Sequence, residues 1–426
     1  MSSVKNTIGI AGAGIAGLSA GILLQQAGHA VHIFESGLVS GGRIQSRWMH
    51  GYLVEAGPEF IHGNARETIR LLKKYKIPFV PANGKMYSAF EGRILETNDR
   101  SETWDQLLDQ MKNLEKDLPF GEFLLKYFPG TAHEELRESA TGFAEGFDLA
   151  DTRTASTQAL AVEWQSEDSG QFRIPGGYDT LVRFMEDEFI SAGGKIWFQH
   201  MVESVNWTSK DIRLEVNKHP PYTVDKLIVT LPVPMLNHSA TNLPRLLFNP
   251  FPEEQLNTFA QIGYGTVVKL VMIWKSAFWK TPIPDAQFIF SEGFIPTWWT
   301  QYPLDLPLLT GWLGGPAAEN VSEKPDEFFL DRGLETLSDV FSIPVSELKN
   351  ELVDFRVFSW KKETWSRGAY SFPTVQSHQA RIFSLKSWDR RIYFAGEAFY
   401  EGLHPGTVEA ALVSGIDRAR QLLAEM

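Results

Sequence analysis

The sequence contains no cysteine among its 426 residues. A disulfide, a thiolate metal site and a cofactor attached through cysteine are therefore excluded. No apolar run approaches the ~18 residues of a membrane-spanning helix, and no cluster of lysine and arginine marks a surface for nucleic acid. No histidine or carboxylate spacing typical of a metal site occurs. We expect no transmembrane anchor, no nucleic-acid partner and no metal site, and a cytoplasmic location is the simplest expectation.

Length and charge set further bounds. A chain of 426 residues is long enough for two or three domains, each with its own core. The 52 acidic residues outnumber the 40 basic ones and give a formal net charge of −12. Such a charge attracts cationic small molecules at long range, although a solvated acidic surface is the commoner explanation.

The most informative segment lies near the N-terminus. Apolar residues 8–11 predict a strand, and a G-x-G-x-x-G turn follows, formed by Gly12, Gly14 and Gly17. The first glycine permits the tight turn, the second lets the backbone approach a pyrophosphate, and the third lets the next helix pack on the strand. Glu35 ends the next predicted strand, where a carboxylate accepts hydrogen bonds from a ribose hydroxyl. This order of features predicts a dinucleotide bound at a helix N-terminus.

A second glycine-rich segment indicates which dinucleotide is bound. Residues 39–44 read Val-Ser-Gly-Gly-Arg-Ile and contain Gly42 and Arg43. This segment comes too early for the next unit of a nicotinamide-binding domain, whereas a glycine turn with an arginine suits a pyrophosphate and the edge of an isoalloxazine ring. No second fingerprint for NAD(P)H is present. The sequence therefore favours FAD, and an oxidase over a reductase.

Three further motifs carry a resemblance to a known family. Residues 51–63 end in Ile-His-Gly, residues 393–397 read Tyr-Phe-Ala-Gly-Glu, and residues 404–411 read His-Pro-Gly-Thr-Val-Glu-Ala-Ala. With the N-terminal fingerprint they resemble the flavin-containing amine oxidase superfamily, which includes monoamine, polyamine and L-amino acid oxidases. The resemblance implies FAD, with contacts from Gly57, Pro58, Glu59, Phe60, Val202, Gly396 and Glu397. Because the chain has no cysteine, we expect the FAD to be non-covalent, or at least not cysteine-linked as in monoamine oxidases.

The resemblance and the sequence pattern predict an α/β fold with a Rossmann-like FAD-binding domain and a discontinuous, mixed α+β substrate domain. The predicted FAD-binding domain comprises residues 1–84, 171–235 and 386–426, and the substrate-binding domain comprises residues 85–170 and 236–385. Within the latter, the charged and aromatic pattern of residues 85–168 predicts helices.

The C-terminal motif also has a physical interpretation of its own. Residues 391–395 predict a buried strand, and residues 406–422 predict a helix. The backbone N–H groups of Thr407 and Val408 stand at the start of this helix. They are predicted to bond the electron-rich edge of a reduced flavin.

A lysine stands in an otherwise apolar predicted strand. In residues 266–274 both faces are apolar, yet Lys269 shares a face with Val267 and Val271. A lysine in this place is often an edge residue whose stem packs while its ammonium reaches water. The resemblance implies a different role, because the amine oxidase branch carries a lysine here that holds a water near flavin N5 and assists the reaction of reduced flavin with oxygen. Protoporphyrinogen oxidases and carotene desaturases share the nucleotide motifs, so Lys269 matters for choosing between branches.

The chemistry of amines constrains the substrate pocket. An amine must be neutral to lose a hydride, whereas an alkylamine resembling lysine has a pKa near ~10.4. An apolar aromatic pocket favours the neutral form by desolvating the cation. The predicted substrate domain and its border offer aromatic candidates, most of which belong to ordinary core: Phe294, Trp298, Trp299, Trp312, Trp360, Trp365 and Tyr370. By resemblance, Tyr370 faces the flavin.

Two histidines and an arginine complete the candidates. His62 lies in the Ile-His-Gly motif and is predicted to position substrate, whereas His404 begins the C-terminal motif. A structural hydrogen-bonding role is the alternative for each histidine. Arg173 either pairs with a substrate carboxylate or supports the Pro-Gly-Gly turn that follows it.

The sequence thus predicts an FAD-dependent oxidase that converts the C–N bond of an amine or amino acid to an imine by hydride transfer to flavin N5, with O2 as acceptor and H2O2 as product. The predicted catalytic residues are Lys269, Tyr370 and His62. One alternative is a C–C desaturase or porphyrinogen-type oxidase on the same scaffold, and another is a flavin-binding protein without turnover. The identity of the amine and the oligomeric state stay open.

Overall fold

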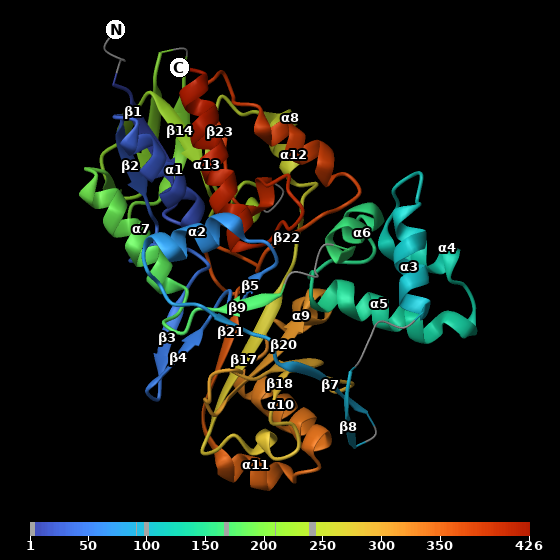
Figure 1. Ribbon diagram of the computed structural model, residues 1–426. Coiled ribbons are helices and arrows are strands. Elements are labelled where there is room, and N and C mark those ends of the chain that lie inside the picture. The colour runs from blue at the N-terminus through green and yellow to red at the C-terminus, as the bar shows by residue number, and fades with distance from the viewer. Residues whose placement is uncertain (1–4, 91, 98–101, 166–169, 209, 238–243) are drawn as a thin grey trace.

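The computed structural model describes residues 5–90, 92–97, 102–165, 170–208, 210–237 and 244–426. Figure 1 shows three regions: a parallel sheet with flanking helices at the top, a larger sheet with helices below it, and a group of helices to one side.

Five parallel strands form the sheet that carries the nucleotide motif. Their order is β10 (Lys195–Trp197), β2 (Ala30–Phe34), β1 (Thr7–Ala11), β14 (Lys226–Val229) and β23 (Ile392–Phe394). The helices that pack here are α1 (Ile15–Gln26), α7 (Asp179–Ser191) and α13 (Val408–Ala424), with α1 against both others. Fully buried apolar side chains such as Ile8, Ile10 and Ile33 form the core between the layers. The predicted Rossmann-like α/β fold is confirmed.

A seven-stranded sheet forms the second region. Its order is β21 (Leu352–Ser359), β17 (Val267–Trp274), β20 (Leu308–Gly314), β19 (Thr297–Trp299), β18 (Ala286–Ser291), β7 (Lys85–Phe90) and β8 (Arg93–Glu96). Helices α10 (Asp326–Phe341) and α11 (Val345–Glu351) lie below it (Figure 1). Strand β17 lies between β21 and β20, and all eight of its residues are buried. The interpretation of Lys269 as an edge residue is therefore wrong.

Residues 85–96 also differ from the prediction, because they form strands where helices were expected. Strand β7 pairs in parallel with β18, and β8 pairs with β7. The segment contains residues of high β propensity, including Tyr87 and Phe90, and β18 offers them a partner from a distant part of the chain. The helices begin only at α3 (Glu102–Lys112).

Smaller elements complete the architecture. A four-stranded sheet has the order β13 (Tyr222–Val224), β12 (Ile212–Val216), β11 (Val202–Trp207) and β15 (Leu247–Asn249). Short sheets are β3 (Ser46–Met49) with β4 (Tyr52–Glu55), β5 (Ile61–His62) with β9 (Gln171–Arg173) and β6 (Val80–Pro81), and β16 (Gly263–Tyr264) with β22 (Ser371–Phe372). The predicted division gives residues 247–249 to the substrate domain, yet β15 pairs with β11. The domain boundaries stay a prediction.

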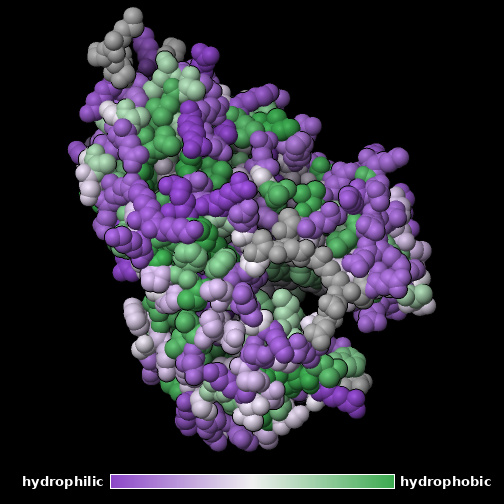
Figure 2. Space-filling view, viewed as in Figure 1, coloured by the Kyte–Doolittle hydropathy of each residue, from purple (hydrophilic) through white to green (hydrophobic). Residues whose placement is uncertain are grey.

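The remaining helices include a lateral group with its own core. This group comprises α3, α4 (Phe120–Tyr127), α5 (Glu134–Gly146) and α6 (Thr157–Gln165), and the others are α2 (Arg66–Lys74), α8 (Glu253–Phe259), α9 (Gly315–Val321) and α12 (Ser377–Leu385). Figure 2 shows a hollow between the lateral group and the body of the molecule. Within the ranges given above, no helix combines the length and apolar character needed to cross a membrane.

Candidate active site

The turn between β1 and α1 leaves room for a phosphate group. Gly12 has a φ of +108°, and a Cβ at Gly17 would lie 2.1 Å from the Gly12 carbonyl oxygen, so both positions require glycine. A Cβ at Gly14, by contrast, would meet no described atom within 4 Å, and Gly42 lies beside it. Gly14 directly precedes α1, whose N-terminus has no side-chain cap in the described structure. Open space at an uncapped helix N-terminus fits the pyrophosphate of a dinucleotide.

The Glu35 carboxylate lies at the same turn. Its Oε2 accepts the N–H of Ala13 at 2.8 Å, and its Oε1 accepts the N–H of Gly37 at 2.7 Å. The N–H of His200 donates to the Glu35 carbonyl oxygen at 2.8 Å, which brings the start of β11, at Val202, toward this region. A carboxylate has about four lone-pair sites, so Glu35 retains acceptor capacity for a ribose hydroxyl. Contacts from Glu35 to ribose and from Val202 to FAD stay predictions.

An ion pair joins the N-terminal and C-terminal motifs. Arg43 Nη1 lies 2.8 Å from Glu397 Oε1 and also donates to the Ala369 carbonyl oxygen at 2.7 Å. The other Glu397 oxygen accepts the Ser371 hydroxyl at 2.6 Å. Close packing continues at Gly57, where a Cβ would lie 2.0 Å from the Arg43 carbonyl oxygen. The motifs at the two ends of the chain therefore lie in direct contact, and their binding of the flavin stays a prediction.

The start of α13 completes this end of the site. Thr407 caps the helix, because its hydroxyl oxygen accepts the Ala410 N–H at 3.1 Å. A Cβ at Gly406 would lie 2.9 Å from Tyr370 Cδ2, so the tyrosine ring packs on the loop that precedes the helix. The Tyr370 hydroxyl donates to the Phe147 carbonyl oxygen at 2.6 Å. Tyr370 thus links the C-terminal motif to the lateral helices, and the predicted helix start next to Thr407 is confirmed.

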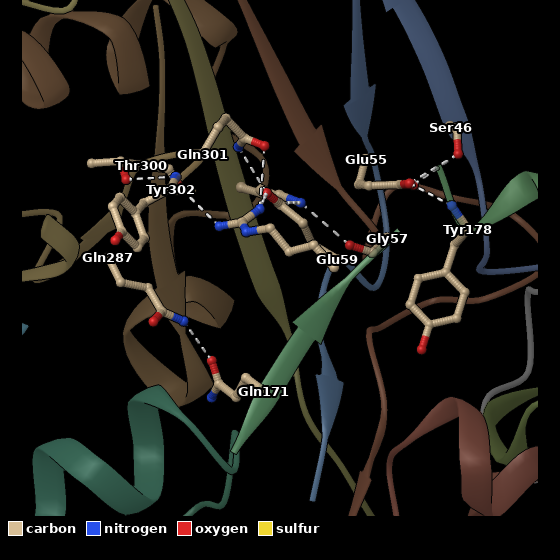
Figure 3. Close-up of polar contacts among 12 residues, drawn as sticks. Ser46, Glu55, Gly57, Glu59, Gln171, Tyr178, Gln287, Thr300, Gln301 and Tyr302 are labelled. Carbon is tan, nitrogen blue, oxygen red and sulfur yellow. Dashed lines mark hydrogen bonds and ion pairs between the residues drawn. The ribbon is translucent and has the colours of Figure 1, made fainter. Parts of the chain in front are cut away.

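Lys269 belongs to a buried network of charges. Its Nζ lies 2.7 Å from Glu59 Oε2 and 3.3 Å from the Gly57 carbonyl oxygen. The second Glu59 oxygen, Oε1, accepts Arg173 Nη1 and, at 2.8 Å, Gln301 Nε2 (Figure 3). Lys269 is 1% exposed and Arg173 is 3% exposed. The Glu59 carboxylate therefore pairs with two buried cations, Lys269 on β17 and Arg173 on β9.

The electrostatics of the two neighbouring carboxyl groups differ. Burial alone would raise the pKa of Glu59, but the charges of Lys269 and Arg173 outweigh it and lower this pKa to about 2. For Glu55 burial dominates and raises the pKa to about 7, although its hydrogen bond from the Tyr178 N–H and the charge of Lys269 act in the opposite direction. Near neutral pH Glu59 is ionised, whereas Glu55 takes up and releases protons.

Aromatic rings line the Lys269 network on one side. Lys269 Nζ lies 5.4 Å from the centre of the Trp299 ring, and Trp299 lies 5.8 Å from Phe60 and 5.7 Å from Trp312. The Phe60 ring in turn lies 5.9 Å from that of His62. We call Phe60, Trp299 and Trp312 the aromatic wall. These rings pack together as one apolar cluster beside the buried charges.

His62 lies beside the aromatic wall. Burial, with a smaller effect from nearby His404, lowers its pKa to about 4. Its Nδ1 lies 3.3 Å from Gln171 Nε2, and its ring meets that of Phe147 edge to face at 5.8 Å. Since the Tyr370 hydroxyl binds the Phe147 carbonyl, His62 and Tyr370 share one neighbour. A chain of contacts thus joins the three predicted catalytic residues. Phe60 and Trp299 lie between His62 and Lys269, and Phe147 lies between His62 and Tyr370.

Comparison with known proteins establishes the family. The family model described as flavin containing amine oxidoreductase matches residues 15–423. The chain belongs to this family. Membership implies a flavin cofactor, and the absence of cysteine excludes a cysteine-linked one.

Curated relatives of this amine oxidoreductase differ in length. Lysine-specific histone demethylase 1B of Mus musculus is 24% identical over 97% of this chain, but the match covers only 52% of the demethylase. Polyamine oxidase 2 of Arabidopsis thaliana is 21% identical over 98% of this chain and 88% of its own length. The chain therefore spans about half the length of the histone demethylase it matches.

Solved amine oxidases share the fold. Putrescine oxidase bound to putrescine has a TM-score of 0.83 at 18% identity, over 99% of both chains. Cyclohexylamine oxidase from Brevibacterium oxydans IH-35A has a TM-score of 0.82 at 16% identity, also over 99% of both chains. At these identities the likeness establishes the fold of the amine oxidoreductase.

Several contributors to the site were not foreseen from the sequence. The motif assigned Glu59 to cofactor contacts, whereas its carboxylate bonds Lys269 and Arg173. Arg173 also donates to the Thr300 carbonyl oxygen at 2.7 Å, which supports the structural interpretation of this residue. Gln301 carries no motif signal at all. A buried lysine without an acidic neighbour in its own strand was the one signal that a distant carboxylate must exist.

The other aromatic candidates have different locations. Trp298 belongs to the core on the opposite face of the large sheet, and Trp360 donates to the Ala56 carbonyl oxygen at 2.9 Å. Phe294 and Trp365 are 38% and 37% exposed. In the part of the chain that is described, no three histidine or acidic side chains gather as a metal site would require.

Proposed function

We propose that this amine oxidoreductase is an FAD-dependent oxidase that converts a small amine to an imine, with O2 as acceptor and H2O2 as product. The observation that carries the proposal is the buried Lys269 ammonium, which lies between the Gly57 carbonyl oxygen and the aromatic wall. FAD, when bound, supplies the hydride acceptor and transfers the electrons to dioxygen. Gly12, Gly14, Gly17 and Glu35 would hold its nucleotide half.

The geometry of Lys269 supports a role in binding water. An ammonium has three N–H donors. Two of them are directed at Glu59 and at the Gly57 carbonyl oxygen, which leaves one for a water molecule. Because the Glu59 pKa is about 2, the lysine keeps an ionised partner at every physiological pH. A fixed positive charge would stabilise the negative charge that develops when dioxygen is reduced.

The surroundings of the substrate support an amine in its neutral form. The aromatic wall offers apolar surface, which disfavours an alkylammonium relative to the neutral amine. With a pKa of about 4, His62 is uncharged near neutral pH and introduces no competing positive charge. Its Nδ1 accepts from Gln171 Nε2, so its Nε2 carries the proton and can donate to the lone pair of a neutral amine. Tyr370 would limit the other side of the slot.

The hydrogen bonds of Arg173 support an amine rather than an amino acid as the substrate. Both of its Nη atoms are engaged, by Glu59, Gln301 and the Thr300 carbonyl oxygen. Arg43 is likewise engaged by Glu397. Each arginine is already paired with a carboxylate of the protein, which disfavours either one as the main anchor for a substrate carboxylate. The names of the solved relatives, putrescine oxidase and cyclohexylamine oxidase, agree with an amine substrate.

The test is anaerobic mixing of the purified yellow protein with primary amines, diamines, polyamines and L-amino acids while flavin absorbance is followed. We expect bleaching by amines, and peroxide after air is readmitted. Bleaching by amino acids alone would overturn the preference for amines. If no compound bleaches a flavin that dithionite still reduces, the C–C desaturase or porphyrinogen-type oxidase, or a flavin-binding protein without turnover, replaces the proposal. The cytoplasmic location and the absence of a nucleic-acid partner stay predictions.

A further inference from the structure

A cavity of about 230 Å³ lies beside the Lys269 network. Its polar lining comprises Glu55, Glu59, Arg173, Gln301 and Thr310, and the β3–β4 hairpin contributes Trp48 and Tyr52. Trp48 is 76% exposed, so the cavity reaches the protein surface at the hairpin. Its described lining does not include His62, Tyr370 or Thr407. The cavity therefore approaches Glu59 from a side other than the proposed substrate slot.

The lining and the size both favour water in this cavity. The volume is sufficient for several water molecules, and the carboxyl, guanidinium and amide groups of the lining provide the two to four polar partners that each requires. Arg173 Nε is buried and has no hydrogen-bond partner among the described residues. Since a buried N–H is normally satisfied, a water in the cavity is the natural acceptor.

Glu55 is the last residue of β4, in the hairpin that lines the cavity. Its carboxyl group accepts the Tyr178 N–H at 2.7 Å and the Ser46 hydroxyl at 3.0 Å (Figure 3). It lines the cavity together with Glu59, and the two carboxyl groups repel each other's ionised forms. With a pKa of about 7, Glu55 donates and accepts protons near neutral pH. The amine-oxidising chemistry proposed above leaves it without a role.

We propose that the cavity and the carboxyl groups of Glu55 and Glu59 form a proton path from solvent to Nζ of Lys269. This inference rests on the proposed function. Conversion of O2 to H2O2 takes two electrons and one proton from the reduced flavin anion, and one further proton from solvent. Lys269 Nζ–H supplies that second proton, and the path returns one to the neutral amine that remains.

The ion pair with Lys269 allows Glu59 to relay a proton. As long as Lys269 is charged, it holds the Glu59 carboxylate in its ionised form. When Nζ gives up its proton, the contribution of Lys269 to this stabilisation is lost while Arg173 stays paired with Glu59, so the effect of burial raises the Glu59 pKa above its value in the charged network. Glu59 then takes a proton from cavity water, which Glu55 replenishes, and passes it to Nζ along the 2.7 Å hydrogen bond. The pair returns to its charged state.

The first experiment measures reoxidation of photoreduced flavin by O2 in stopped flow, in H2O and D2O. Photoreduction makes the test independent of any amine, so failure of the proposed function and failure of the path are distinguishable. We expect E55Q to slow reoxidation at least about tenfold and to increase the solvent isotope effect. L304W, which fills the cavity from a separate lining residue, is expected to slow it as well. The control E203Q removes an exposed carboxylate on β11 and should leave the rate unchanged.

A second readout requires no turnover. In the infrared spectrum of the oxidised protein at pH 6, the Glu55 carboxyl band should be absent from E55Q, and in the wild type it should shift within seconds of transfer to D2O. Slow exchange would show that water does not reach Glu55. Reoxidation of both E55Q and L304W within twofold of the wild type would overturn the path, whatever amine the protein oxidises.

Discussion

The two ends of the proposed active site differ in composition: one consists mainly of backbone and open space, and the other of charged side chains. At the nucleotide end, the turn around Gly12, Gly14 and Gly17 offers backbone, open space and a helix N-terminus. At the reaction end, Lys269 and Arg173 place two buried positive charges on either side of Glu59. The first end needs the absence of side chains, whereas the second depends on three charged side chains that compensate one another. Substitutions should therefore damage the two ends for different reasons.

The largest effect is expected at Glu59. E59Q keeps the shape of the side chain but leaves two buried cations without their carboxylate, which should cost about 3–5 kcal/mol of folding free energy. Urea unfolding of the flavin-loaded protein measures this loss. The matched control E203Q, on an exposed position of β11, should stay within about 0.5 kcal/mol of the wild type. A loss below about 1 kcal/mol for E59Q would mean that water or other groups compensate the cations.

A pair of glycine variants tests the other end. In G17A the new Cβ would lie 2.1 Å from the Gly12 carbonyl oxygen, so the helix must move and stability should fall by about 1–3 kcal/mol. In G14A the new Cβ meets no described atom, so stability without flavin should be nearly unchanged while flavin affinity falls. Thermal unfolding and flavin titration separate the two quantities. Equal flavin affinity of G14A and the wild type would contradict the placement of the pyrophosphate.

Lys269 tests whether the charge at the reaction end serves chemistry as well as folding. K269M removes the ammonium but leaves Glu59 paired with Arg173. We expect reoxidation by O2 to slow at least about tenfold, which corresponds to about 1.4 kcal/mol of activation free energy, with a smaller change in flavin reduction by amine. Stopped-flow absorbance resolves the two half-reactions. A decrease of less than about threefold in reoxidation would refute the proposed role.

The smallest effect is expected from the pH dependence of Glu55. Its pKa of about 7 exceeds the ordinary value of 4.5, so the folded protein binds more protons here than the unfolded chain between these values. The stability that follows is present below pH 4.5 and is lost as pH rises through 7. E55Q does not lose this stability. Its free energy of unfolding should therefore rise by about 1 kcal/mol relative to that of the wild type between pH 5 and pH 8.5. The change is smaller than the full pKa shift would give because the cavity admits water, which screens the charge. Thermal unfolding of both proteins at each pH measures this. If the stability difference between E55Q and the wild type does not change with pH, Glu55 does not titrate in this range.

The sequence allowed prediction of the nucleotide end because its signals are local. Gly12, Gly14, Gly17 and Glu35 follow one another within a single strand-helix-strand unit. The pairing of Lys269 with Glu59 joins residues 210 positions apart, and no local pattern specifies which carboxylate meets a buried lysine. Strand β7 was missed for the same reason, because its partner β18 lies in a distant segment. Local geometry is encoded in neighbouring residues, whereas charge compensation is decided by tertiary packing.

The closure of the parallel sheet has a consequence for the order of assembly. Strand β23 and helix α13 come from residues 392–424, and Arg43 meets Glu397 across 354 positions of sequence. A ribosome therefore delivers the phosphate-binding turn long before the groups that close around it. Contacts of such long range also make folding slow. Flavin is consequently expected to enter a chain that has already been synthesised through α13, so the supply of free FAD during maturation should govern the yield of active protein in the cell.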